Sequence, residues 1–405
     1  MKILKRVTAV LLTAVVAVSF TACGGRSEHA KKLNIDTAVS INIWYQDDAY
    51  TSYLDYIAQQ FHKANEFITV NSVKVEENNL LDAVYNGSIA QNNVADVYLM
   101  EASDMERAYL MGLTAENDAY TQYYSQKHFP VTAINAACYE GKLYGYPVTF
   151  HTAVMVYNKK YATAPENFEQ IEAFLNSYQV TDENKDVNMI VGWDSQDLWT
   201  NYAFGGSYVD NGGAQGEDTE SDVQTEALKA AMTEYAALQN TFGIVDKTQE
   251  EYKQMFMNNQ LIYTILDSTQ LADLNASGVD YGICAVPGAK TGFGTQSLSD
   301  TTLAMVNPYS ENTDTAKAVA QAISYDYADL LEKDTGYISA RTDVADKNKK
   351  TLYQPLYEVY AQSDSYAKYI GADEFYVRYS ILLHNIWKGE DLNESVDAFI
   401  KAVSR

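Results

Sequence analysis

The stretch "INIWYQDDAYTSYLDYIAQQFHKAN" (residues 41–65) joins a strand pattern directly to a helix pattern. Residues 41–45 form a short apolar run of strand length, and Tyr53, Ile57 and Phe61 then recur at helical spacing. A buried strand that leads straight into an amphipathic helix is the repeating unit of α/β folds. This stretch therefore indicates an α/β protein.

The same unit repeats further along the chain. Residues 72–77 ("SVKVEE") alternate like a strand, Leu81, Val84 and Ser88 mark a helix face, and residues 95–100 ("ADVYLM") form a third apolar run. Strand, helix, strand, helix, strand predicts a largely parallel sheet with helices on both faces. Ligands of such sheets meet the loops at the carboxyl ends of the strands.

Local signals mark helix ends in both halves. Ser103 and Glu106 have the spacing of a capping box, and Gly112 suits the end of that helix. Thr248 and Glu251 have the same spacing and predict a second capping box.

The second half continues in the same style. A helix pattern follows Pro165, and a longer one over residues 228–238 is expected to stop at Gly243. Strand-like runs then follow at residues 261–266, 281–286 and 302–306.

The N-terminus has the pattern of an export signal. Lys2, Lys5 and Arg6 precede an apolar run over residues 7–20, which is shorter than the roughly twenty residues that span a bilayer. Small residues then flank Cys23 in "SFTACGG", which resembles the lipobox of bacterial lipoproteins, in which this cysteine is acylated. The resemblance implies a signal peptide at residues 1–22, a lipid anchor at Cys23 and a polar tether at residues 23–39. The alternative is a secreted protein in which Cys23 has no role.

Composition narrows the class of partner. The 405 residues carry a formal charge of −25, which argues against binding of nucleic acid or of anionic lipid surfaces. The 33 tyrosines and four tryptophans would suit sugar recognition, because planar rings with polar tips stack well on sugars. Cys138 and Cys284 lie in apolar stretches and are expected to be buried thiols, although a disulfide between them stays open.

Catalytic and metal motifs are missing from the sequence. The five histidines lack metal-ligand spacing, and neither G-x-S-x-G nor H-E-x-x-H occurs. Carboxylate pairs carry no information here, because 54 acidic residues make chance pairs frequent. We therefore expect a protein that is not an enzyme and that has no cofactor or bound metal.

One central segment points to a family. "YEGKLYGYPVTFHTAVMVYNKKY" (residues 139–161) contains Gly-Lys, an aromatic residue with glycine, Pro147 and then Tyr-Asn-Lys. This succession resembles extracellular solute-binding protein family 1, the sugar-type binding lipoproteins of ABC importers, whose best-known member is maltose-binding protein. Further segments resemble the family in the expected order, and these are residues 95–116, 165–175, 279–290 and 310–323.

The resemblance implies a type II periplasmic-binding-protein-like α/β fold. Each of two lobes would have a central, mostly parallel sheet flanked by helices, and crossover segments would form a hinge between them. The implied N-terminal lobe is residues 40–148 plus 285–331, and the implied C-terminal lobe is residues 149–284 plus 332–405. A ligand would bind in the cleft, the lobes would close on it, and a membrane permease would recognise the closed form.

Ligand contacts follow from strand ends and from the family pattern. The expected contacts are Tyr45, Gln46, Asp47, Glu101, His151, Trp193, Asp197, Trp199, Asp267 and Tyr337. Several have an ordinary alternative: Asp47 could cap the next helix, Glu101 could be a solvated loop charge, and His151 could be a plain hinge residue. Trp199 could pack in the core, as Trp44 is expected to do.

These observations predict a monomeric, lipid-anchored protein on the outer face of the cell membrane. It would capture a carbohydrate, specifically an oligosaccharide, for the permease of an ABC importer. One alternative keeps the fold and changes the ligand to a polyamine or another cationic solute. A second is a secreted glycan hydrolase.

Overall fold

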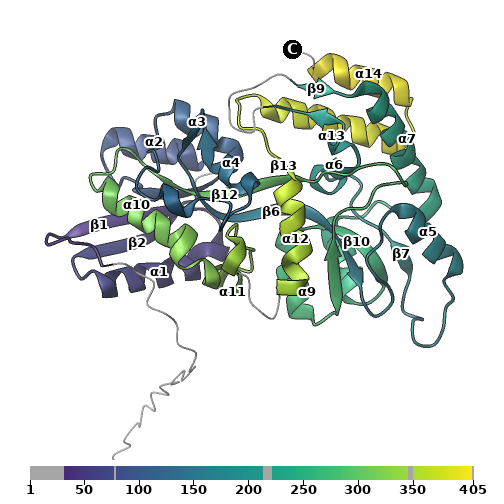
Figure 1. The fold of residues 1–405 in the computed structure, drawn as a ribbon, viewed down its shortest axis with the longest axis horizontal. Helices are drawn as coiled ribbons and strands as arrows, with labels where there is room; N and C mark the ends of the chain where they lie inside the picture. Colours follow the sequence, from purple (N-terminus) through teal and green to yellow (C-terminus); the bar gives the residue numbers. More distant parts are fainter. Residues whose placement is uncertain (1–31, 77–78, 213–220, 345–349, 404–405) are drawn as a thin grey trace, which may run out of the picture.

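The computed structural model describes residues 32–76, 79–212, 221–344 and 350–403. The chain forms two lobes that lie side by side and are joined by the long strands β6 (Tyr146–Asn158) and β12 (Leu298–Val306) (Figure 1). One path of strands runs through both lobes in the order β2-β1-β3-β12-β6-β10-β7. Cys23 and most of the predicted tether lie outside the described residues.

The N-terminal lobe is built on three parallel strands. Strand β1 (Val39–Tyr45) pairs in parallel with both β2 (Ile68–Lys74) and β3 (Val97–Glu101), which confirms the arrangement predicted for them. The helices of this lobe are α1 (Thr51–Ala64), α2 (Leu80–Ala90), α3 (Met105–Leu110), α4 (Val131–Ala137), α10 (Thr313–Gln321) and α11 (Leu331–Thr335). The apolar face predicted for α1 is buried against the sheet.

Strand β6 belongs to both lobes. Its first half pairs antiparallel with β12, from Tyr146 to Thr152. Its second half pairs antiparallel with β10 (Leu261–Asp267) and with β11 (Tyr281–Cys284). Because β6 leaves one lobe while β12 returns to it, the two strands run in opposite directions, and the sheet as a whole is mixed.

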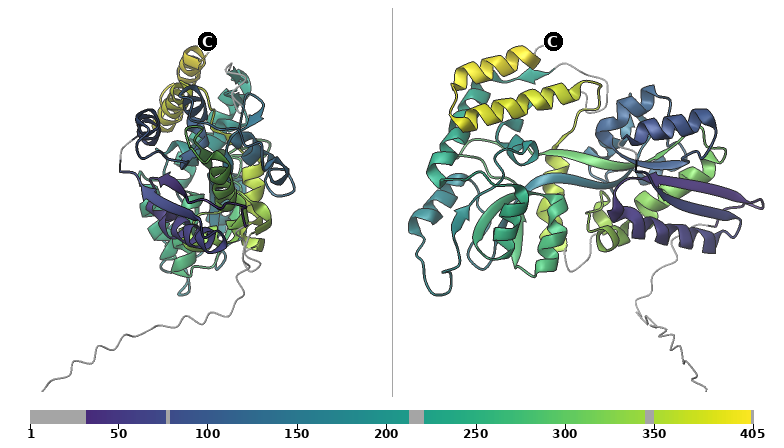
Figure 2. Two further views of the ribbon diagram at one scale, coloured as in Figure 1. Left: turned by 90° about the vertical axis from the view of Figure 1, so that its left-hand side faces the viewer. Right: turned by 180° about the vertical axis from the view of Figure 1, so that it is seen from behind.

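The C-terminal lobe packs its helices around a shorter sheet in which β10 is parallel to β7 (Met189–Val191). Its helices are α5 (Phe168–Ser177), α6 (Leu198–Gly206), α7 (Thr225–Phe242), α8 (Gln249–Met257), α9 (Leu271–Ser277), α13 (Ala372–Lys388) and α14 (Leu392–Val403). Helix α12 (Lys350–Gln362) lies between the lobes in Figure 1 and in the view from behind in Figure 2.

Short elements complete the chain. The short strands are β4 (Cys138–Tyr139), β5 (Lys142–Leu143), β8 (Val209–Asp210), β9 (Asp222–Val223) and β13 (Asp364–Ser365). The short helical turns are Asp48–Tyr50, Ala102–Asp104, Thr121–Tyr123, Ser268–Gln270, Ala322–Asp326, Ala328–Leu330 and Thr342–Val344.

One predicted capping box forms and the other does not. At α8, the Thr248 side chain accepts from the Glu251 backbone, and the Glu251 side chain accepts from the Thr248 backbone. At α3, a short turn over Ala102–Asp104 leads into the helix, and Asp104 caps it without a side-chain hydrogen bond. The prediction was wrong there because Ser103 hydrogen-bonds Asp300 instead.

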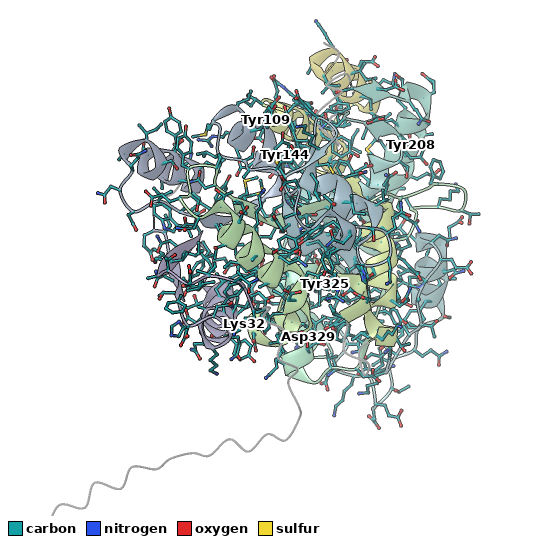
Figure 3. The ribbon with its side chains drawn as sticks, turned by 60° about the vertical axis from the view of Figure 1, so that its left-hand side comes forward. Lys32, Tyr109, Tyr144, Tyr208, Tyr325 and Asp329 are labelled. Carbon is teal, nitrogen blue, oxygen red and sulfur yellow. The ribbon has the colours of Figure 1, made fainter. Side chains whose placement is uncertain are left out.

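Tyrosine is mainly a core residue in this protein. More than half of the 33 tyrosines are buried, and tyrosines are most of the largest fully buried side chains. Tyrosine rings also pack against one another, as the rings of Tyr109 and Tyr144 do with centroids 5.6 Å apart (Figure 3). The tyrosine content therefore says less about sugar recognition than composition suggested.

Three smaller expectations can be compared with the structure. Trp44 is only 7% exposed, which confirms its place in the core. Cys138 and Cys284 are free thiols and only partly buried. Across the described ranges, no helix combines the length and the hydropathy needed to cross a bilayer.

Candidate functional site

Two adjoining cavities form one continuous cleft. The first has a volume of about 440 Å³ and lies at the ends of β1 and β3, whereas the second has a volume of about 610 Å³. Both are lined by Glu101, Asp104, Arg107 and His151, so these side chains mark the junction of the cavities. The second cavity has α3 of the N-terminal lobe on one side and residues 366–373 with Trp199 of the C-terminal lobe on the other.

The first cavity gathers side chains that follow β1. Tyr45, Gln46 and Asp47 all line it, as expected where the carboxyl end of a parallel strand meets a loop. The Tyr337 hydroxyl donates to Asp47 Oδ2 at 2.7 Å, which joins a distant segment to this strand end. Asp47 Oδ1 also accepts from the Ala49 backbone at 2.9 Å, so the capping role considered for Asp47 is confirmed.

Glu101 ends β3 at the junction of the two cavities. Its Oε1 accepts from the Thr302 hydroxyl at 2.9 Å, and its Oε2 is shielded from solvent with no hydrogen-bond partner among the described residues. Burial, and then the nearby charge of Asp300, raise the pKa of the Glu101 carboxyl. Glu101 is therefore not a solvated loop charge.

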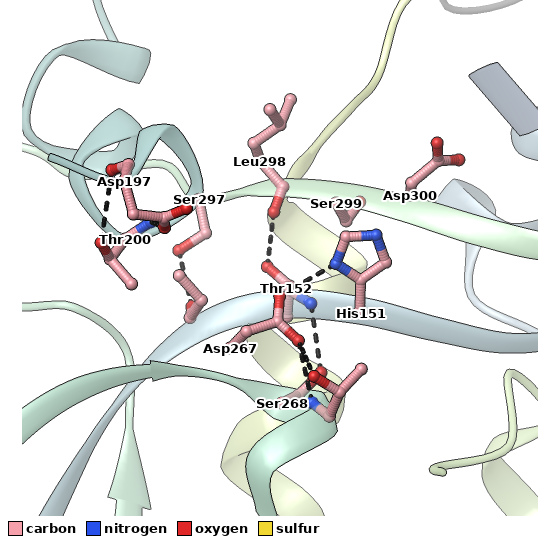
Figure 4. A network of polar contacts seen from close by, with 12 residues as sticks. His151, Thr152, Asp197, Thr200, Asp267, Ser268, Ser297, Leu298, Ser299 and Asp300 are labelled. Atoms are coloured by element: carbon pink, nitrogen blue, oxygen red, sulfur yellow. Dashed lines mark hydrogen bonds and ion pairs between the residues drawn. The ribbon is translucent and has the colours of Figure 1, made fainter. Parts of the chain in front are cut away.

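His151 and Asp267 form an ion pair beneath the cleft. Nδ1 of His151, on β6, lies 2.9 Å from Oδ2 of Asp267, at the end of β10 (Figure 4). Although burial acts in the opposite direction, the hydrogen bond and the charge of Asp267 raise the pKa of His151 to about 9. The same pairing overcomes burial at Asp267 and lowers its pKa.

Aromatic rings line the second cavity. The Trp199 ring lies 4.4 Å from the His151 ring, and 5.9 Å from the Tyr366 ring in a stacked orientation (both centroid to centroid). Tyr366 is held by its hydroxyl, which donates to Asp373 Oδ1 at 2.7 Å. Trp199 is partly exposed, so it offers a ring to the cavity while it packs against the lobe.

Three of the expected contacts line neither cavity. One is Asp267, which pairs with His151 beneath the cleft, and the other two are Trp193 and Asp197. Trp193 is 0% exposed, packs against Phe168 and Phe204 and donates to Asn201 Oδ1 at 2.8 Å. Asp197 caps α6 by accepting from the Thr200 backbone at 2.8 Å (Figure 4). Their positions suit a core residue and a helix cap, and we leave both out of the proposed contact set.

Sequence reasoning missed several lining residues. Tyr50, Asp104, Arg107 and Asp300 line the cleft, as does the segment Tyr366–Asp373. Asp300 carried a usable signal, because a carboxylate is unusual in a buried strand and Asp300 is the one charged residue of β12. Segment 366–373 carried none, since it lies far along the chain from the other lining residues.

The chemistry of the cleft is recognition by rings and carboxylates. Among the described residues, no group of three or more His, Cys, Asp or Glu side chains is placed to hold a metal ion. The side chains in the cleft could stack on a ring and exchange hydrogen bonds with hydroxyl or amino groups.

A family model described as bacterial extracellular solute-binding protein matches residues 56–355 of the chain. The chain belongs to this family. Among characterised proteins, this solute-binding protein is similar to the maltodextrin-binding protein MdxE of Bacillus subtilis (strain 168). The two are 22% identical over 303 residues, which is 71% of this chain and 69% of MdxE.

Solved structures share the fold of this solute-binding protein. A cyclo/maltodextrin-binding protein complexed with maltotetraose superposes with a TM-score of 0.76 at 15% identity, over 92% of this chain and 98% of the other. An extracellular solute-binding protein from Staphylococcus aureus in complex with maltose gives 0.74 at 18% identity, over 91% and 98%. The predicted fold class and family are thereby confirmed.

Proposed function

We propose that this solute-binding protein captures a carbohydrate, specifically an oligosaccharide, in the cleft between its lobes for an ABC importer. The observation that carries the proposal is the cleft itself, in which the Trp199–Tyr366 ring pair faces carboxylates such as Glu101 from the other lobe. Rings that stack on sugar faces and acceptors for hydroxyls are what a sugar site requires. The maltodextrin and maltose named for the relatives belong to the same class of ligand.

The proposed mechanism is closure of the two lobes on the ligand. A ligand shifts an open–closed equilibrium only as far as it binds the closed state better, so it must touch both lobes at once. Glu101 and Trp199 meet that requirement because they come from different lobes. We propose residues 40–148 plus 285–331 and residues 149–284 plus 332–405 as the moving units, with β6 and β12 as the hinge.

We further propose that the protein is anchored by a lipid on Cys23 and works as a monomer on the outer face of the membrane. The basic and then apolar leader and the small residues around Cys23 support this location. A closed lobe pair would then be presented to the permease subunits of the importer. The proposal involves no enzymatic step.

Calorimetry with a panel of oligosaccharides, which includes maltotriose, tests the proposal. We expect saturable binding of at least one saccharide, together with a smaller radius of gyration in X-ray scattering. Trp199→Ala should weaken that binding by about tenfold, since it removes a stacking ring. The matched control is Tyr309→Ala, which removes an exposed ring that lines neither cavity and should leave affinity unchanged.

Two other outcomes would overturn the proposal. Tight binding of spermidine with no response to any saccharide would identify a cation-binding protein. Conversion of a saccharide to products by the purified protein would identify a glycan hydrolase.

A further inference from the structure

Two carboxylates that line the second cavity accept hydrogen bonds only from neutral groups. Glu101 accepts from the Thr302 hydroxyl, and its second oxygen is buried with no hydrogen-bond partner among the described residues. Asp300 lies on β12, is 5% exposed, and accepts from the Thr301 backbone at 2.7 Å and from Ser103. A buried carboxylate is costly to keep charged unless a cation stands close to it.

The cationic side chains that line the cleft are already engaged elsewhere. Arg107 pairs with Asp82 at 2.9 Å, and Lys368 Nζ donates to the backbone carbonyls of Asn135 and Cys138. His151 does face Glu101 and Asp300, but its Nδ1 is bonded to Asp267. This group therefore contains three carboxylates and one imidazolium, so it keeps an excess of negative charge.

The negative charges of Glu101 and Asp300 repel each other, which makes it harder to keep both carboxylates ionised. Burial is the largest cause that raises the pKa of each, and the charge of Asp300 raises the pKa of Glu101 further. A hydroxyl donor would satisfy the free oxygen of Glu101 but would leave this repulsion in place. A cation between the carboxylates would remove both costs. A metal ion does not fit, because no metal-ligand cluster exists among the described residues.

We propose that the carbohydrate bound by this protein carries a protonated amino group, which is held by Glu101 at the junction of the cavities and by Asp300 in the second cavity. The inference rests on the proposed function, because the neighbouring Trp199 and Tyr366 rings are read as the stacking surface for the sugar. The amine donates to the carboxylate of Glu101, which lines both cavities, and lies within the field of Asp300, which lines the second.

Three trisaccharides with one backbone separate the amine from the sugar. The glucosamine trimer, its N-acetylated form and cellotriose share the β-1,4 linkage and differ in the group at C2. Calorimetry in a low-salt buffer near neutral pH should show the glucosamine trimer binding at least about tenfold more tightly than either neutral trimer. Added salt should reduce that ratio, because an ionic contact is screened.

Glu101→Gln tests the residue. The substitution keeps the shape and one acceptor but removes the charge, so the preference for the amine over cellotriose should fall by about tenfold. Glu390→Gln is the control, because it removes one exposed acidic charge that lines neither cavity and should leave the preference unchanged.

Each result bears on one proposal or on both. Equal or tighter binding of the neutral trimers would overturn the amine and leave carbohydrate capture standing, as would tight binding of maltotriose with no response to the glucosamine trimer. Binding of spermidine alone, with every saccharide inert, would overturn both. A preference that Glu101→Gln does not change would remove Glu101 from the amine site.

Discussion

His151 and Asp267 form an ion pair beneath the cleft, and this pair joins the middle of β6 to the end of β10. His151 is in the part of β6 that pairs with β12, whereas Asp267 ends β10, which pairs with the other half of β6. Their ion pair is mostly shielded from water, with 24% and 11% of the side chains exposed. A shielded pair is sensitive to the loss of one partner, because the remaining charge is left without compensation.

Asp267→Asn should therefore destabilise the fold in a pH-dependent way. The amide keeps the bonds to Thr269 but loses the charge, and we expect the free energy of unfolding to fall by about 2 kcal/mol near pH 6. Because the pKa of His151 is raised to about 9, its contribution is complete below its unfolded value of about 6.5 and is lost as the pH rises through about 9. The contribution of Asp267, whose pKa is lowered, is lost only in acid.

Urea titrations at several pH values measure this difference. The gap between the wild type and Asp267→Asn should be widest near pH 6 and should close above pH 9. Asp280→Asn is the matched control, since it breaks an exposed pair with Lys159 and should change stability little at any pH. Equal effects of the two substitutions would show that the His151–Asp267 pair contributes no more to the free energy of unfolding than an exposed pair does.

At the residue scale, the sequence predicted side chains near strand ends better than side chains on distant segments. Glu101 and Asp47 line the cleft because the carboxyl ends of parallel strands share one edge of a sheet. Trp193 was predicted as a contact because it is close to Trp199 in the sequence, but it packs inside the lobe among apolar side chains. Tyr366 could not be predicted, because its approach to Trp199 depends on the tertiary fold.

At the element scale, the two capping boxes show what a local pattern can decide. The Thr248 box forms because Oε2 of Glu251 accepts from the Thr248 backbone while its Oε1 pairs with Lys247. The Ser103 box does not form, because the Ser103 side chain donates a hydrogen bond to Asp300 and Glu106 accepts one from the Tyr139 hydroxyl at 3.0 Å. Strand direction followed the same rule, since the apolar run at residues 302–306 predicted a strand but not that β12 runs antiparallel to β6.

Thr248→Ala should lower the free energy of unfolding by about 1 kcal/mol, because it leaves a backbone donor at the start of α8 without its acceptor. Thermal or urea unfolding followed by circular dichroism measures the change. Thr233→Ala is the matched control in the middle of α7, where the exposed alanine should be neutral or slightly stabilising. A neutral Thr248→Ala would mean that the helix start is held by tertiary packing alone.

At the scale of the whole molecule, one segment of the C-terminal lobe bridges the cleft. Lys368 is only 1% exposed and donates to the Asn135 and Cys138 carbonyls at the end of α4. Two residues later, the Ile370 backbone donates to Glu106 on α3. These contacts join the lobes beside the second cavity, so the proposed opening of the lobes would have to break them.

Lys368→Met should therefore favour the open arrangement. Methionine can fill much of the same space but cannot donate to the end of α4, so the bridging contacts weaken while packing is largely kept. We expect a larger radius of gyration in X-ray scattering without ligand, and weaker binding of any saccharide that the wild type closes on, since more of the binding energy is then used to close the lobes. Lys388→Met makes the same change of charge at an exposed site on α13 and should alter neither quantity. If both variants scatter like the wild type while their melting curves show intact folds, the bridge does not control the balance between open and closed lobes.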